Sequence, residues 1–131
     1  MLRRQVLTAA FAGAALLLGS AAQAAEQRPF DRAAFEAAQA AGRPILVDVY
    51  ADWCPTCRAQ APAVAAAIGG AQYRQLVVFK LNFDKQKADW RQMGVQRQST
   101  LIAFNGRRET GRVVGETDPT AIAQLIATTL R

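Results

Sequence analysis

Cys54 and Cys57 are the residues of this chain whose type and spacing point to chemistry. They are its only cysteines, two residues separate them, and the chain has no histidine. Without histidine, Ser-His-Asp and Cys-His catalysis are excluded, as are histidine-ligated metal sites. Two cysteines alone cannot complete a four-ligand zinc site. Thiols this close can form and break a disulfide, so reversible redox chemistry is the leading interpretation.

A helix that begins at Cys54 would favour the reactivity of its thiol. The apolar, β-branched segment 45–50 predicts a buried strand. Cys54-Pro55 then predicts the start of a helix, because proline is tolerated in the first helical turn. Unpaired backbone N–H groups and the positive end of the helix dipole stabilise a thiolate there. Cys54 is therefore the predicted nucleophile, and Cys57, one turn later, is predicted to resolve the mixed disulfide.

The remaining segments predict an α/β fold. Besides the strand over 45–50, we expect helices over 31–41, 54–68, 86–93 and 118–130 and strands over 76–83, 100–104 and 110–114. A β-α-β crossover makes the first two strands parallel, and the later hairpin adds antiparallel strands. We predict one domain with a central four-stranded mixed sheet flanked by helices. The Cys54 loop would lie at the carboxyl end of that sheet, where α/β sites usually lie.

An ordered set of segments resembles the thioredoxin family. Residues 47–57, V-D-V-Y-A-D-W-C-P-T-C, resemble the active-site segment of the family from its aspartate through W-C-x-x-C. Pro62 falls where thioredoxins kink the active-site helix, and three later segments match in order: K-L-N-F-D at 80–84, F-N-G at 104–106 and V-G at 114–115. The resemblance spans about residues 31–130. It implies a thioredoxin-like fold and a redox-active disulfide between Cys54 and Cys57, with no other cofactor.

Residues around the cysteine pair have candidate roles. Asp48 lies in the apolar strand six residues before Cys54, where a buried carboxyl group could relay the proton of Cys57, and Lys80 is its candidate charge partner. The alternatives are an Asp48 bonded to backbone, an exposed strand Lys80, and a Trp53 that only packs. The candidate catalytic residues are Cys54, Cys57, Asp48 and Lys80, and the candidate substrate-binding residues are Trp53, Pro55, Gln98, Ser99, Thr100 and Gly115.

One position departs from the family pattern. Thioredoxins have a cis-proline directly before the T-L of the hairpin strand, facing the cysteines, and Ser99 takes that place here. A cis bond that does not precede proline costs about 2.5–4 kcal/mol, so we expect Gln98-Ser99 to be trans. We also expect Ser99 to lie close to the cysteine pair and to affect substrate binding more than the redox step. Loss of the proline ring also leaves room for a metal or cluster on the cysteines.

Residues 1–24 predict an export signal. Arg3 and Arg4 precede an apolar run over 6–18, and Ala22-Gln23-Ala24 fits a small-residue cleavage site. The run is shorter than the roughly 20 residues that a spanning helix needs, so a retained anchor is the less favoured alternative. The arginine pair also occurs in twin-arginine signals, which leaves the export route open. We expect cleavage near Ala24 and a periplasmic thioredoxin-like domain over 25–131.

Together these patterns predict an exported thiol-disulfide oxidoreductase that acts as a dithiol reductant. The Cys-Pro-Thr-Cys segment is similar to that of exported reductases that serve cytochrome c maturation, and it lacks the histidine of strongly oxidising relatives. The expected partners are protein disulfides and a membrane thiol-reductant donor, and the expected state is a monomer. The alternative is a metal- or iron-sulfur-binding module in which two chains share four thiolates.

The formal net charge of the chain is +6, and its basic residues are scattered. This pattern favours a solvated basic face over a docking patch for an acidic partner, and we expect no nucleic-acid binding.

Overall fold

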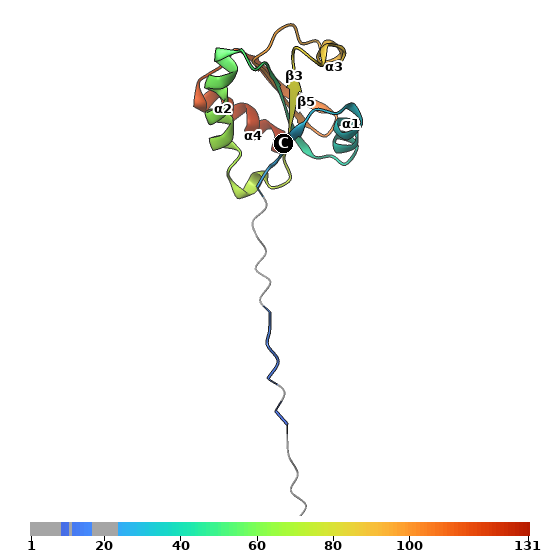
Figure 1. The fold of residues 1–131 in the computed structure, drawn as a ribbon, viewed down its shortest axis with the longest axis vertical. Helices are drawn as coiled ribbons and strands as arrows, with labels where there is room; N and C mark the ends of the chain where they lie inside the picture. The colour runs from blue at the N-terminus through green and yellow to red at the C-terminus, as the bar shows by residue number, and fades with distance from the viewer. Residues whose placement is uncertain (1–8, 11, 17–23) are drawn as a thin grey trace, which may run out of the picture.

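A five-stranded mixed β-sheet forms the centre of the protein (Figure 1). The computed structural model describes residues 9–10, 12–16 and 24–131. The strands are β1 (Glu26–Pro29), β2 (Pro44–Tyr50), β3 (Val77–Asn82), β4 (Thr100–Asn105) and β5 (Arg108–Val114). They lie in the order β1-β3-β2-β4-β5, in which β3 is parallel to β1 and β2, whereas β4 is antiparallel to β2 and β5. The predicted α/β fold is confirmed.

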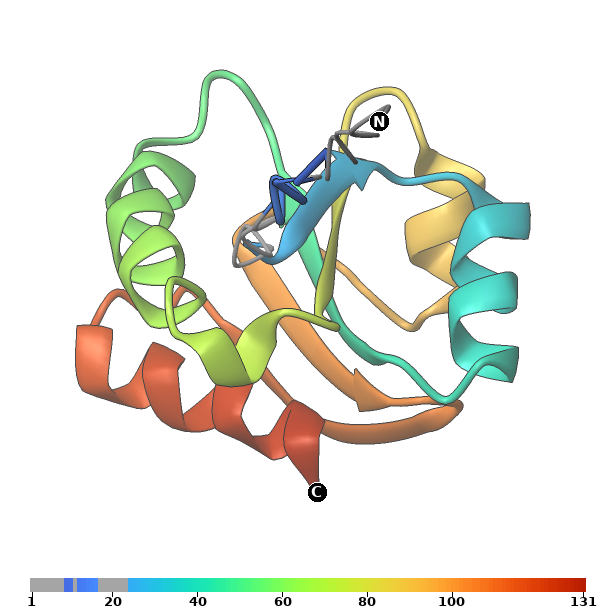
Figure 2. The same ribbon diagram turned by 90° about the horizontal axis from the view of Figure 1, so that it is seen from below.

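Helices cover both faces of the sheet. They are α1 (Arg32–Ala40), α2 (Pro55–Ala67), α3 (Lys87–Gln92) and α4 (Pro119–Ala127), with short 3-10 turns η1 (Ala71–Tyr73) and η2 (Thr128–Leu130). α1 and α3 lie on one side of the sheet, and α2 and α4 on the other (Figures 1 and 2). Among the described parts of the chain, no helix is long and apolar enough to cross a bilayer.

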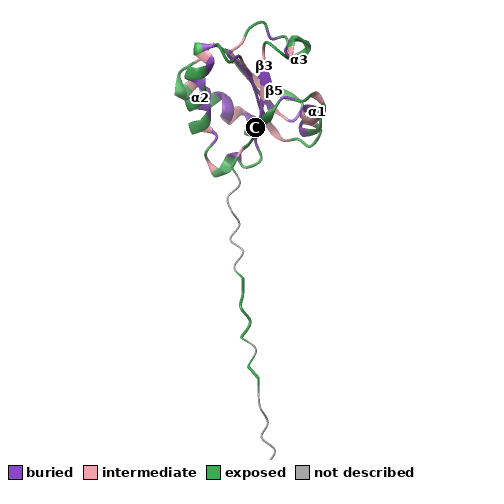
Figure 3. Cartoon of the chain, in the orientation of Figure 1, coloured by how far each residue is buried: buried purple, intermediate pink, exposed green. Residues whose placement is uncertain are grey.

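The inner strands are mostly buried (Figure 3). Their side chains alternate between two cores, one on each face of the sheet. Val47 and Val49 of β2 belong to the core beneath α1 and α3, where Phe35 packs edge to face on two other phenylalanine rings. Leu46 belongs to the core beneath α2 and α4. Since successive strand residues point to opposite faces, Asp48 points to the same face as Leu46, toward the α2 side.

The sheet has one strand more than the sequence predicted. β1 pairs in parallel with β3, and backbone bonds from Glu26 to Leu76 (3.0 Å) and from Phe30 to Lys80 (2.8 Å) continue the pairing at both ends. All four residues of β1 are exposed, so the segment E-Q-R-P shows no apolar alternation. Charged residues and a proline are typical of an edge strand, which pairs through its backbone alone. The expectation of four strands was therefore wrong.

The ends of the elements follow local hydrogen bonds. Asp31 caps α1 by accepting from the backbone N–H of Ala34 at 2.9 Å, as its place before the helix predicts. α4 ends at Ala127, earlier than predicted, and η2 follows it. The hydroxyl groups of Thr128 and Thr129 donate to backbone carbonyls three residues earlier, and such local bonds compete with continuation of an α-helix.

Candidate active site

The cysteine pair lies at the junction between strand β2 and helix α2. Cys54 caps α2, and Pro55 is the first helical residue. Cys54 and Cys57 form a disulfide, with their Cα atoms 5.3 Å apart. The backbone N–H of Cys57 also donates to Cys54 Sγ at 3.1 Å. This N–H and the helix N-terminus are placed to stabilise a thiolate on Cys54 when the disulfide opens.

The disulfide has both buried and exposed neighbours. Ala51 is buried with the cysteines, and Tyr50 and Phe83 pack against this small cluster. Trp53 is 54% exposed, and its indole N–H donates to Asp84 Oδ2 at 2.9 Å. Trp53 directly precedes Cys54 and is partly open to solvent, so its role in lining the substrate groove stays a prediction.

Asp48 and Lys80 form an ion pair beneath the site. The two residues are direct neighbours in the β2–β3 ladder, and Lys80 Nζ lies 2.7 Å from Asp48 Oδ2. The Asp48 side chain is 8% exposed and that of Lys80 is 34% exposed. Lys80 Nζ also lies 4.7 Å from the centre of the Tyr50 ring. A buried carboxylate needs such a partner, and the structure pairs Asp48 with the candidate charge partner Lys80. The role of the pair in catalysis stays a prediction.

A solvent pocket reaches this ion pair from the edge of the sheet. Its volume is about 360 Å³, and its lining includes Pro29 of β1, Tyr50 and Lys80. β1 forms one wall of the pocket, so the strand that the sequence did not predict helps to shape the surroundings of Lys80.

Ser99 is fully buried in a left-handed conformation. The Gln98–Ser99 bond is trans, as expected, and Ser99 has a φ of 58°. Its N–H donates to Val49 O at 2.8 Å, and its carbonyl accepts from the N–H of Gly115 at 2.9 Å. The side chain of Ser99 donates to Gln98 O at 2.6 Å. The structure thus joins three predicted substrate-binding residues: Ser99, Gly115 at the end of β5, and Thr100 at the start of β4.

Ser99→Pro is expected to destabilise the fold by about 2–4 kcal/mol. Proline fixes φ near −65°, whereas Ser99 has a φ of 58°. Proline also lacks the N–H that Ser99 donates to Val49. Urea unfolding measures the effect.

Ser99→Gly is the matched control. Glycine adopts positive φ without a steric cost and keeps the N–H, so stability should be unchanged or higher by up to about 1 kcal/mol. Equal stability of Ser99→Pro and wild type would contradict the conformation described.

Two side chains at the site were missed by the sequence reasoning. Tyr50 packs against the cysteines and lies under Lys80. Gln60 of α2 is buried and donates two hydrogen bonds to loop carbonyls. A signal for Gln60 existed, because it is a polar residue three positions after Cys57, where a helix presents the same face.

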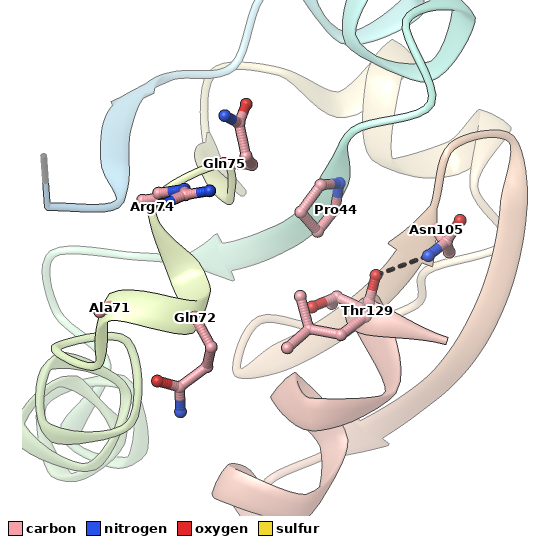
Figure 4. A pocket seen from close by; sticks show the side chains of 8 residues that line it. Pro44, Ala71, Gln72, Arg74, Gln75, Asn105 and Thr129 are labelled. Atoms are coloured by element: carbon pink, nitrogen blue, oxygen red, sulfur yellow. Dashed lines mark hydrogen bonds between the residues drawn. The ribbon is translucent and has the colours of Figure 1, made fainter.

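A larger pocket lies at the opposite end of the sheet from the disulfide. It has a volume of about 560 Å³, and Pro44 at the start of β2 and Asn105 at the end of β4 contribute to its wall (Figure 4). The Asn105 side chain donates to Thr129 O at 2.8 Å. None of the predicted catalytic or substrate-binding residues lines it. The disulfide end of the sheet is therefore the candidate active site.

Comparison with protein families gives a match to the model described as Thioredoxin over residues 26–128. Thioredoxin of Alicyclobacillus acidocaldarius is 36% identical over 81 residues, which cover 62% of this chain and 76% of that protein. Thioredoxin-1 of Saccharomyces cerevisiae is 34% identical over 93 residues, which cover 71% of this chain and 87% of that protein.

A similar crystal structure is that of Trxlp from Edwardsiella tarda. It is 46% identical, with a TM-score of 0.74, and the match covers 77% of this chain and 98% of that one. Sequence and structure therefore agree on the same group of proteins.

Proposed function

The chain belongs to the thioredoxin family and is a thiol-disulfide oxidoreductase, and from this we propose that it is an exported dithiol reductant of protein disulfides. The observation on which the proposal rests is the Cys54–Cys57 disulfide at the N-terminus of α2, above the buried Asp48–Lys80 ion pair. This arrangement supports the proposal, in which Cys54 is the nucleophile, Cys57 the resolving thiol and Asp48 the buried carboxylate that accepts a proton.

The reaction transfers two electrons and two protons from the dithiol to a substrate disulfide. The Cys54 thiolate attacks one substrate sulfur, forms a mixed disulfide, and releases the other substrate sulfur as a thiolate that takes up a proton. The Cys57 thiol gives its proton to a base and attacks Cys54 Sγ. The substrate then leaves as a dithiol, and the chain returns to the disulfide seen here. Asp48 is the proposed acceptor of the Cys57 proton.

The direction of electron flow is proposed from the residues between the cysteines. A pair is strongly oxidising when its environment stabilises the reduced form, as a positive charge beside the thiolate does. Pro55 and Thr56 have no charge. We therefore propose that the pair is a reductant and that a membrane thiol donor reduces it after each turnover. The export proposal rests on the order of the Arg3-Arg4, apolar and Ala22-Gln23-Ala24 segments.

The alternative function, a metal or iron-sulfur cluster shared by two chains, has less support. A shared cluster needs both sulfurs of each chain at the surface, whereas Cys54 is 1% exposed and Cys57 is 9% exposed. Both sulfurs also point to each other in the disulfide.

One experiment tests export and direction together. Cells that express the full chain are quenched with acid, fractionated, and treated with a maleimide that adds mass to each free thiol. We expect protein of the extracytoplasmic fraction to begin near Ala25 and to bear two labels on most molecules, because a reductant is held as the dithiol. Protein that begins at Met1 in the cytoplasmic fraction would contradict export, and an unlabelled exported protein would contradict the reductant role.

A further inference from the structure

Gln60 is a buried amide that links three segments of the active site. It lies in α2, 1% exposed, one helical turn after Cys57. Its Nε2 donates to Ser99 O at 3.1 Å and to Glu116 O at 2.9 Å. Ser99 directly precedes β4 and Glu116 follows β5. The N–H of Gly115 donates to Ser99 O at 2.9 Å. One side chain thus holds both loops against the helix that contains the cysteines.

The amide of Gln60 is not explained by packing. Its Oε1 is buried and has no hydrogen-bond partner among the described residues. An unpartnered buried acceptor costs free energy, and an apolar side chain of the same length would avoid that cost. What the amide adds is its pair of N–H donors, and both point to backbone carbonyls of the two loops.

The loop at Ser99 depends on outside contacts for its conformation. Ser99 has a φ of 58°, a conformation that costs a residue with a side chain about 1–2 kcal/mol, and no proline ring restricts it. The contacts that hold Ser99 are its N–H to Val49 O, its carbonyl to the N–H of Gly115, and its carbonyl to Gln60. The Gln60 bond is the one that reaches the cysteine helix.

We propose that Gln60 is a positioning residue that fixes the Ser99 and Gly115 backbone relative to Cys54 and so sets the affinity for protein disulfides. This inference rests on the proposed function and on the prediction that Ser99 and Gly115 bind the substrate. A disulfide in a protein needs both the sulfur and the neighbouring backbone to be aligned. A small disulfide needs only its sulfur to be aligned with Cys54, so the rate of its reduction should not depend on Gln60.

The test compares Gln60→Met with wild type. Methionine keeps the length of the side chain. It removes the two N–H donors of Gln60 and also the buried Oε1 that has no partner, so the midpoint of thermal unfolding should change little. KM for reduction of insulin should rise about five- to tenfold with kcat unchanged, and the rate with the small disulfide DTNB should not change. Gln124→Met, the same change at an exposed site in α4, is the control and should match wild type in every measurement.

Hydrogen exchange makes the test independent of substrate. The Gly115 amide should exchange about tenfold faster in Gln60→Met, whereas the Phe83 amide, which donates to Tyr50 O, should be unchanged. Gln60→Glu keeps the length but cannot donate to both carbonyls, because a carboxyl group has at most one O–H, and it should raise both KM and Gly115 exchange.

The outcomes separate the inference from the proposed function. Wild type that does not reduce insulin would contradict the proposed function. The positioning role would still be tested in that case, because exchange of the Gly115 amide in Gln60→Met needs no substrate. Unchanged KM and unchanged exchange in both Gln60 variants would overturn the positioning role. Equal loss of insulin and DTNB reduction, or failure of Gln60→Met to fold, would also overturn it, because Gln60 would then support the fold and not the substrate.

Discussion

Cys54→Ser is expected to abolish disulfide reduction, with a rate at least about a thousandfold below that of wild type. The serine hydroxyl is not ionised near neutral pH and forms no disulfide with a substrate. Cys54 caps α2 through its sulfur, and serine is a good N-cap, so the fold should be retained. Insulin reduction with dithiothreitol as the electron source measures the rate.

Cys57→Ser distinguishes the roles of the two cysteines. It leaves the nucleophile in place but removes the thiol that resolves the mixed disulfide, so we expect a stable adduct between Cys54 and the substrate. Mass spectrometry after reaction with an excess of disulfide substrate detects the adduct. Adducts in Cys54→Ser and not in Cys57→Ser would reverse the assignment of the nucleophile.

Asp48→Asn is expected to slow the resolving step about a hundredfold near neutral pH. Asparagine has nearly the same shape and can still bond Lys80 through its oxygen, but it cannot take up the proton of Cys57. Lys80 is 34% exposed, so solvent can replace part of the lost ion pair, and the free energy of unfolding should change by only about 1 kcal/mol. Rapid-quench trapping of the mixed disulfide over a range of pH measures the step.

Asp52→Asn is the matched control for Asp48→Asn. Asp52 is an exposed carboxylate two residues before Cys54, so this change removes the same charge near the site without touching the buried ion pair. It should alter the rate no more than about twofold. If both changes slowed the resolving step equally, the effect would come from the loss of negative charge near the site. An unchanged rate and pH profile in Asp48→Asn would leave Asp48 with a structural role alone.

The local sequence around the cysteines determined most of the chemistry and the order of the elements. Cys54-Pro55 predicted a helix start after the buried strand, because proline is favoured at the first helical position. The apolar runs over 45–50 and 76–83 predicted the two central parallel strands, since both faces of such strands are covered. Asp48 stood out as the acidic residue of an apolar strand. These signals are local in the chain, so they can be recognised without knowledge of the tertiary contacts.

Tertiary structure decided what depends on contacts between distant segments. The backbone pairing of β1 leaves no pattern in its exposed side chains. The Asp48–Lys80 pair requires the β2–β3 register, and the conformation of Ser99 follows from bonds to Val49 and Gly115. The bonds from Gln60 join residues 39 and 56 positions apart. A hydrogen bond across such a span is set by the geometry of the whole fold, so no property of Gln60 and its neighbours in sequence could specify its partners.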